Sequence, residues 1–311
     1  MSSTLRFGIM TLQNLSYPDM VEHWQHLESL GFDSVWLGDH FVDPYVPTGY
    51  WFDGWTLLAA LATETKRIRF GPLVASITLR NPALLARQAM TIDHISNGRL
   101  ELGIGAGRAP LDHSMTGTSA WETPERARRF RECVEIVDHM LRHSTTTYQG
   151  RHYQIKDAAM NPLPIQQPRL PLTLAAHGST TLKITAALAD AWNSFGKFGA
   201  SAEESLAITR ERNTMLDDYC TALGRDPRTL RRSFLSGMTA ERPFVSLQAF
   251  HDYIGRYQDA GINEFIFYWL PEAGHPVMPE RGLNGVAITS RDMLDSIATK
   301  AIPAIKAKGA G

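Results

Sequence analysis

The fold is decided by residues 79–117, which read LRNPALLARQAMTIDHISNGRLELGIGAGRAPLDHSMTG. Asn81 can cap a helix that starts at Pro82, and apolar residues recur at helical spacing after it. Asn97-Gly98 ends this helix, and an apolar strand follows at residues 100–104. The stretch therefore predicts one helix–strand repeat of an α/β fold.

Small residues gather at the carboxyl end of this strand, at Gly103, Gly105, Ala106 and Gly107. They allow the backbone to approach a planar or anionic ligand, and ligands of α/β sheets bind at this edge. The run is not a dinucleotide fingerprint, because Arg108 replaces the third glycine and we expect a long loop, without a helix, over residues 106–123. We therefore look for the site at this edge.

The same alternation of strand and helix runs along the whole chain. Strands are expected at residues 5–10, 34–37, 68–75, 100–104, 172–175, 191–194, 231–238 and 264–269. Helices are expected at residues 18–30, 54–65, 82–95, 124–141, 180–188, 202–223, 247–260 and 290–306. Eight repeats in 311 residues predict a single domain, residues 1–311, folded as an eight-stranded parallel β/α (TIM) barrel.

The connections differ in length, which indicates where the functional face lies. Long insertions follow strands 2, 4 and 8, at residues 40–53, 106–123 and 270–289, and are expected to rise above that face. One more insertion, residues 143–171, precedes strand 5 and contains a hairpin-like run at residues 145–155.

Composition narrows the class of protein. A net charge of -1 with 43% hydrophobic residues predicts a globular chain without nucleic-acid or membrane partners. The charged run ERARRFR, residues 125–131, is interpreted as a solvated helix face. Only two cysteines are present and no signal peptide is recognised, so we expect a cytoplasmic protein. No metal site is expected, because His139 and His143 lack the Glu of H-E-x-x-H.

The second strand ends in WLGDHF, which places Asp39 and His40 at the mouth of the predicted barrel. His40 is the candidate acid/base group, because an imidazole titrates near neutral pH, and Asp39 can orient it or bind a ring N–H. The alternative is that Asp39 caps the next turn and His40 bonds only to backbone.

Aromatic residues are dense in the loop that follows. They can wall a pocket for a flat or apolar substrate, or simply pad the loop against the barrel rim. The candidate substrate contacts are Phe41, Tyr45, Trp51, Asp112 and Trp269.

A phosphate site is predicted after the fifth strand, where the chain reads AHGSTT. His177, Gly178, Ser179 and Thr180 open a helix there, and the free N–H groups of its first turn favour an anion. The alternative is ordinary helix capping by Ser179.

Four segments taken together resemble the bacterial luciferase-like family, over residues 7–269. They are WLGDHF at 36–41, LVASITLRNP at 73–82, TIDHISNGRLELGIGAG at 91–107 and PLTLAAHGSTTLKITAALADAWNS at 171–194. The resemblance implies an eight-fold β/α barrel that binds reduced FMN or its 5-deazaflavin analogue, coenzyme F420. It implies a monooxygenase or a hydride-transferring oxidoreductase, and a homodimer is expected.

The resemblance also implies roles for particular residues. Asp39 and His40 would lie beside the flavin tricycle, and Gly178 and Ser179 would bind the phosphate. A bulge, often with a non-proline cis peptide, would support one ring face. Together with the small residues after strand four and the AHGSTT segment, the predicted cofactor contacts are Asp39, Ala75, Ser76, Ile77, Gly105, Ala106, Gly107, Arg108, His177, Gly178, Ser179 and Thr180.

The chain departs from deazaflavin-dependent relatives after strand four, where Arg108 replaces a tryptophan and Asp112 a glutamate, and Thr116 stands for an aromatic residue. Arg108 can pair with Asp112, contact an anionic substrate or reach the cofactor's tail. Lys197 faces either a phosphate or water.

Three functions follow. The first is a monooxygenase that uses molecular oxygen and reduced FMN from a partner flavin reductase, acting on a small organic substrate. The second is a deazaflavin-dependent dehydrogenase or reductase, and the third is a non-catalytic flavin-binding barrel. In the first two functions, His40 would give or take the proton.

Overall fold

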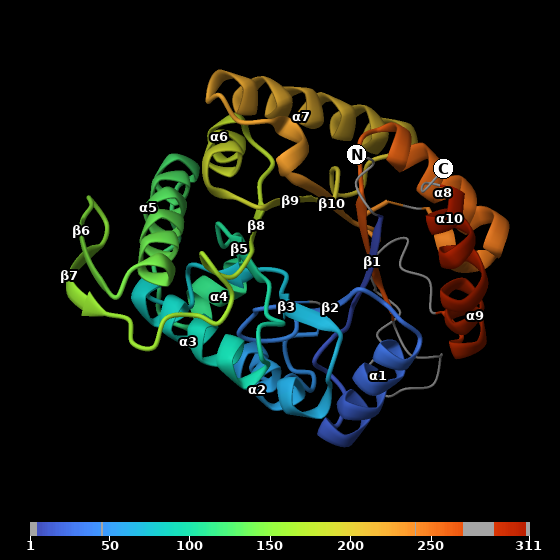
Figure 1. Cartoon of the computed structure of the whole chain (residues 1–311), viewed down its shortest axis with the longest axis horizontal. Coiled ribbons are helices and arrows are strands. Elements are labelled where there is room, and N and C mark those ends of the chain that lie inside the picture. Colours follow the sequence, from blue (N-terminus) through green and yellow to red (C-terminus); the bar gives the residue numbers. More distant parts are fainter. Residues whose placement is uncertain (1–4, 45, 240, 270–288, 309–311) are drawn as a thin grey trace.

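Parallel strands form the centre of the molecule and helices form a ring around them (Figure 1). The computed structural model describes residues 5–44, 46–239, 241–269 and 289–308. Among these residues, nine strands make one sheet in the order β3-β2-β1-β11-β10-β9-β8-β5-β4. The bounds are β1 (Arg6–Met10), β2 (Ser34–Leu37), β3 (Arg69–Pro72), β4 (Ala75–Ser76), β5 (Leu102–Gly105), β8 (Leu172–Ala175), β9 (Ala191–Ser194), β10 (Arg231–Leu235) and β11 (Glu264–Tyr268). The predicted β/α barrel is confirmed as the fold class.

The ninth strand arises because the third predicted strand, residues 68–75, is two strands. The Leu73 N–H still bonds to strand β2, at Leu37 O (2.7 Å), whereas Ala75 pairs with Ile104 of β5. The chain thus passes from one neighbouring strand to the other, with a cis peptide at Leu73-Val74 between them. Since β3 pairs with β2 and β4 with β5, this one strand position closes the barrel.

Most predicted helices begin and end within two residues of the predicted bounds. They are α1 (Tyr17–Ser29), α2 (Gly54–Glu64), α3 (Pro82–Ile95), α5 (Thr123–Arg142), α6 (Ser179–Leu188), α7 (Ala202–Ala222) and α8 (Leu247–Asp259), with short 3-10 turns at Pro227–Thr229 and Pro243–Val245. None of the helices in the described ranges has the length and apolar character needed to cross a bilayer.

Two helical segments differ from the prediction. The loop at 106–123 contains a helix, α4 (Pro110–Met115), which is too short to show apolar periodicity in the sequence. The single helix expected at 290–306 is instead α9 (Arg291–Ser296), a π-helical turn (Ile297–Ala301) and α10 (Ile302–Lys308).

The insertion before β8 is a hairpin of β6 (Thr145–Gln149) and β7 (Gln154–Ala159), as its sequence predicted. It lies beyond α5, outside the ring of helices (Figure 1). The buried carboxylate of Glu132 on α5 accepts the backbone N–H groups of residues 151–153 at 2.9–3.0 Å, which anchors the hairpin turn to the helix.

The barrel interior is charged at one end and apolar at the other. Near the amino ends of the strands, Glu101 pairs with Arg6, Arg69 and Arg231, and Glu264 pairs with Arg6 and Arg231. Burial alone would raise the pKa of Glu101, but these guanidinium groups outweigh it and lower the value to about 2. At the other end the buried side chains are Met10, Trp36, Leu73, Leu235, Ile266 and Tyr268. A ligand at the carboxyl ends of the strands therefore meets an apolar interior.

Candidate active site

An apolar floor lies at the carboxyl ends of the strands. Leu12, Val74, Phe195 and Met238 follow four different strands, pack on the buried apolar layer and stay partly exposed. Partly exposed apolar side chains in a barrel mouth provide contact area for a flat, apolar ligand.

His40 and Asp112 meet at this mouth. His40 follows β2, and its Nδ1 lies 3.0 Å from Asp112 Oδ2. The other carboxylate oxygen of Asp112 accepts the backbone N–H of Phe41 at 2.9 Å, and the Trp51 indole donates to the His40 carbonyl at 3.0 Å. The His40 side chain is 36% exposed and that of Asp112 is 3% exposed. The imidazole is thus held from one side and open on the other.

This contact determines the tautomer of His40. An ionised carboxylate can only accept, so Nδ1 carries the hydrogen and, in the neutral ring, Nε2 keeps its lone pair. An imidazole oriented in this way can accept a proton from a bound substrate and return it. Asp112 was expected to contact substrate, but both of its oxygens are engaged by the chain itself. Pairing of Asp112 with Arg108 is not observed.

Asp39 has a different role from the one predicted. Its carboxylate is bound by the Arg80 guanidinium and accepts the Ser76 N–H at 2.9 Å, so it does not orient His40. Arg80 also bonds to Asp53 at 3.2 Å. Burial raises the pKa of Asp39, although Arg80 and the Ser76 N–H act in the opposite direction. Asp39 therefore secures the start of β4 beneath the mouth. Arg80 was missed, although a single arginine in the apolar run LVASITLRNP was a usable signal.

The segment predicted to support a ring face is in place beside β5. Ala75, Ser76 and Ile77 are buried, and the first two form β4 and pair with Ile104 and Gly105. The cis peptide of this region lies before them, at Leu73-Val74.

The glycines at the end of β5, Gly105 and Gly107, leave room for packing within the chain. A Cβ added to Gly105 would lie 2.3 Å from Val74 Cγ2, and one added to Gly107 would lie 2.6 Å from Thr78 Cγ2. The space that a side chain would need at these glycines is therefore filled by residues 74–78, so packing within the chain is sufficient to explain them, and their contact with a cofactor stays a prediction. Ala106 is half-buried between them.

The amino end of α6 matches the predicted anion site. Gly178 is the N-cap residue and makes no side-chain cap, so the alternative that Ser179 caps the helix is wrong. A Cβ on Gly178 would meet nothing within 4 Å, which leaves open space in front of the first-turn N–H groups. Thr180 is exposed on the outer side of this turn.

His177, next to the amino end of α6, is held in the neutral form. Its Nδ1 lies 3.3 Å from Arg212 Nη1, which also donates to Gly196 O at 2.6 Å. Burial, Arg212 and Arg108 lower the pKa of His177 to about 3. Two cations therefore face this side of the mouth. Arg212 was missed, since nothing local distinguishes it within the charged helix α7.

The predicted substrate contacts divide into two groups. Phe41, which is 54% exposed, and Trp51 lie at the mouth next to His40. Trp269 is buried against α1, with its ring 4.5 Å from that of His23, so the prediction that it contacts substrate is wrong. Its backbone continues the strand, but its side chain points out of the barrel. Tyr45 lies outside the described residues.

A planar aromatic cofactor that carries a phosphate fits this arrangement. The apolar floor would contact the ring, His40 stands at its edge, and the unobstructed end of α6 would accept the phosphate.

Comparison with known proteins agrees with this description. Residues 2–230 match the family model for luciferase-like monooxygenases. An F420-dependent glucose-6-phosphate dehydrogenase of Amycolatopsis mediterranei is 34% identical over 53% of this chain and 49% of its own length. An enzyme of the same description from Microbacterium testaceum is 29% identical over 72% of this chain and 65% of its own length. A 5,10-methylenetetrahydromethanopterin reductase of Archaeoglobus fulgidus is 31% identical over 60% of this chain and 52% of its own length. The chain thus spans about half to two thirds of the length of these relatives.

Solved structures with the same fold are more distant in sequence. The coenzyme F420-dependent tetrahydromethanopterin reductase of Methanopyrus kandleri has a TM-score of 0.75 at 16% identity, covering 97% of this chain and 99% of its own. A monooxygenase of Streptomyces bottropensis has a TM-score of 0.75 at 18% identity, covering 97% and 100%. These two likenesses concern the fold. Because the family model covers most of the sequence, the chain belongs to the luciferase-like monooxygenase family.

Proposed function

We propose that this protein is a 5-deazaflavin-dependent oxidoreductase that moves a hydride between a small organic substrate and coenzyme F420. The sequence analysis placed an oxygen-using FMN enzyme first and this function second. The relatives from Amycolatopsis and Microbacterium are F420-dependent dehydrogenases, and this supports the reverse order.

The contact between His40 and Asp112 carries the proposal. When bound, a 5-deazaflavin gives or accepts a hydride, and the substrate must lose or gain a proton at the same carbon–oxygen or carbon–nitrogen group. His40 Nε2 is the group available for that proton, because Nδ1 is committed to Asp112 at 3.0 Å. Asp112 stabilises the imidazolium that forms and keeps the ring in the useful tautomer.

The remaining residues would bind and orient the cofactor. Val74, Phe195 and their neighbours in the apolar floor would exclude water from the ring. The N–H groups at the start of α6 would take the phosphate, with Arg108 and Arg212 supplying positive charge.

The test is a comparison of the two cofactors on purified protein. We expect F420 to bind more tightly than FMN in a fluorescence titration, and F420 to be reduced by a member of a panel of alcohols and sugar phosphates, followed by loss of absorbance at its long-wavelength band. His40→Ala should bind F420 normally and turn over at least about 100-fold more slowly.

Three outcomes would contradict the proposal. Oxygen uptake with reduced FMN, combined with no F420 binding, would restore the monooxygenase. Full-rate turnover by His40→Ala would remove the proton-transfer role. Binding of F420 without turnover of any panel member or its oxidised counterpart would favour the non-catalytic barrel.

A further inference from the structure

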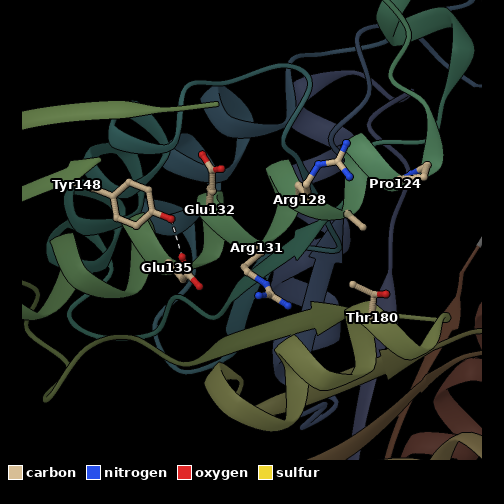
Figure 2. A pocket seen from close by; sticks show the side chains of 8 residues that line it. Pro124, Arg128, Arg131, Glu132, Glu135, Tyr148 and Thr180 are labelled. Atoms are coloured by element: carbon tan, nitrogen blue, oxygen red, sulfur yellow. Dashed lines mark hydrogen bonds between the residues drawn. The ribbon is translucent and has the colours of Figure 1, made fainter. Parts of the chain in front are cut away.

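A pocket of about 540 Å³ lies between α5 and α6, outside the barrel (Figure 2). Two arginines of α5, Arg128 and Arg131, point into it, and Thr180 from the first turn of α6 borders it (Figure 2). Its lining residues are Pro124, Ala127, Arg128, Arg131, Glu132, Glu135, Tyr148 and Thr180. The function proposed above does not use this pocket.

The acidic residues of the pocket are already engaged. Glu132 accepts three backbone N–H groups of the β6–β7 turn, and Glu135 accepts the Tyr148 hydroxyl at 2.6 Å. Glu132 lies four positions after Arg128, and Glu135 lies four positions after Arg131, which is the spacing at which ion pairs form within a helix. Within the described ranges, neither arginine has a hydrogen bond or an ion pair. The pocket therefore presents two guanidinium groups that no carboxylate binds directly, although the charge of Arg128 also acts on Glu125 from a longer distance.

The pocket adjoins the mouth of the barrel. Thr180 stands two residues after Gly178, at the helix end where the cofactor's phosphate is expected to bind. Arg212 lies 3.3 Å from His177 beside that end, and the charge of Arg108 also acts on His177. Positive charge thus extends from the mouth, across the amino end of α6, to Arg131 and Arg128 on its outer side.

We propose that this pocket binds the carboxylates of an anionic tail that extends from the phosphate of the bound deazaflavin, with Arg128 and Arg131 as the binding residues. The inference rests on the proposed function, since F420 carries glutamate residues beyond its phosphate and FMN carries none. Paired guanidinium groups suit carboxylates, and a flexible tail that leaves the mouth past Gly178 meets this pocket next.

The test compares two cofactor forms on two variants. The forms are F420 with its glutamate tail and the same molecule with the phosphate but no glutamates. The variants are Arg128→Gln/Arg131→Gln and a matched control, Arg67→Gln/Arg228→Gln. The control removes the same charge from exposed arginines near the amino ends of the strands. Dissociation constants are measured by fluorescence at low and moderate salt, and melting temperatures verify folding.

We expect the Arg128/Arg131 variant to bind tailed F420 about tenfold more weakly, with an effect that shrinks as salt rises, and to bind the tail-free form as the wild type does. The control should change neither. Equal weakening of both forms, or of neither, would overturn the proposal, as would equal affinity of the wild type for both forms. If the wild type binds neither form but binds FMN, the proposed function fails and the tail site fails with it. Failure of the tail site alone leaves F420 binding intact.

Discussion

Replacing Asp112 by Asn is expected to slow turnover without weakening cofactor binding. Asn has nearly the same size and can still accept the Phe41 N–H through its oxygen. Its amide nitrogen then faces His40 Nδ1 and donates to it, which moves the ring proton to Nε2. In that tautomer His40 cannot accept a proton from the substrate, and no carboxylate stabilises the imidazolium.

The size of the effect follows from the geometry. The carboxylate oxygen of Asp112 lies 3.0 Å from the ring nitrogen of His40, and Asp112 is buried while the His40 side chain is 36% exposed. A full negative charge in this position stabilises the imidazolium by about 2–4 kcal/mol. That range corresponds to a loss of roughly 30- to 1000-fold in kcat. KM and the dissociation constant of F420 should stay near the wild-type values, because Asp112 is buried behind His40.

A double-mutant cycle distinguishes this role from a structural one. The rates of Asp112→Asn, His40→Ala and the double variant are measured with F420 and a substrate found in the panel. If Asp112 acts through His40, the double variant is no slower than His40→Ala alone. Independent, multiplying effects of the two substitutions, or a normal kcat in Asp112→Asn, would refute the reasoning.

Three further predictions concern stability and binding. Glu101→Gln should lower the free energy of unfolding by about 3–5 kcal/mol in urea titrations, because three partly buried guanidinium groups lose the buried carboxylate that they share; a loss below 1 kcal/mol would contradict this. Since the pKa of His177 is lowered to about 3, the folded state binds fewer protons than the unfolded state, and stability falls with pH below about 6.5. His177 should contribute about 2 kcal/mol to the drop from pH 7 to pH 5, and this part should be missing in His177→Gln, whereas the part due to His23, whose pKa burial also lowers, should remain; an unchanged drop would exclude His177 as a source. Gly105→Ala should cost about 1–3 kcal/mol through its clash with Val74. Gly178→Ala meets no neighbour and should cost less than about 1 kcal/mol as an N-cap change, but it should weaken F420 binding; the reverse result would mean that the open space at α6 is not a binding site.

The elements that the sequence predicted well are those whose signals are local. Helix α3 begins and ends at the predicted residues because Asn81 accepts the Ala83 N–H at 2.9 Å, Pro82 occupies the first position, and Asn97 and Gly98 adopt positive φ after the end. The β6–β7 hairpin and the repeating order of strand and helix were predictable for the same reason.

The errors came from contacts between distant parts of the chain. The division of the third strand depends on where its two neighbours, β2 and β5, lie, and no run of residues encodes that. The glycines at 105 and 107 signalled a close approach, but their sequence does not say whether a ligand or Val74 and Thr78 come close. Trp269 directly follows the last residue of β11, yet its side chain turns toward α1.

Local patterns alone were sufficient for the eight-fold repeat, for the family resemblance and for naming His40 and the amino end of α6 as candidate sites, because each depends on residues within a few positions of one another. That Asp112 contacts His40 and that Arg80 binds Asp39 could be seen only in the folded barrel. These partners lie 72 and 41 residues apart, and only closure of the sheet brings them within hydrogen-bonding distance. A buried carboxylate binds the donor that the packed backbone places nearest, and that choice is made in three dimensions.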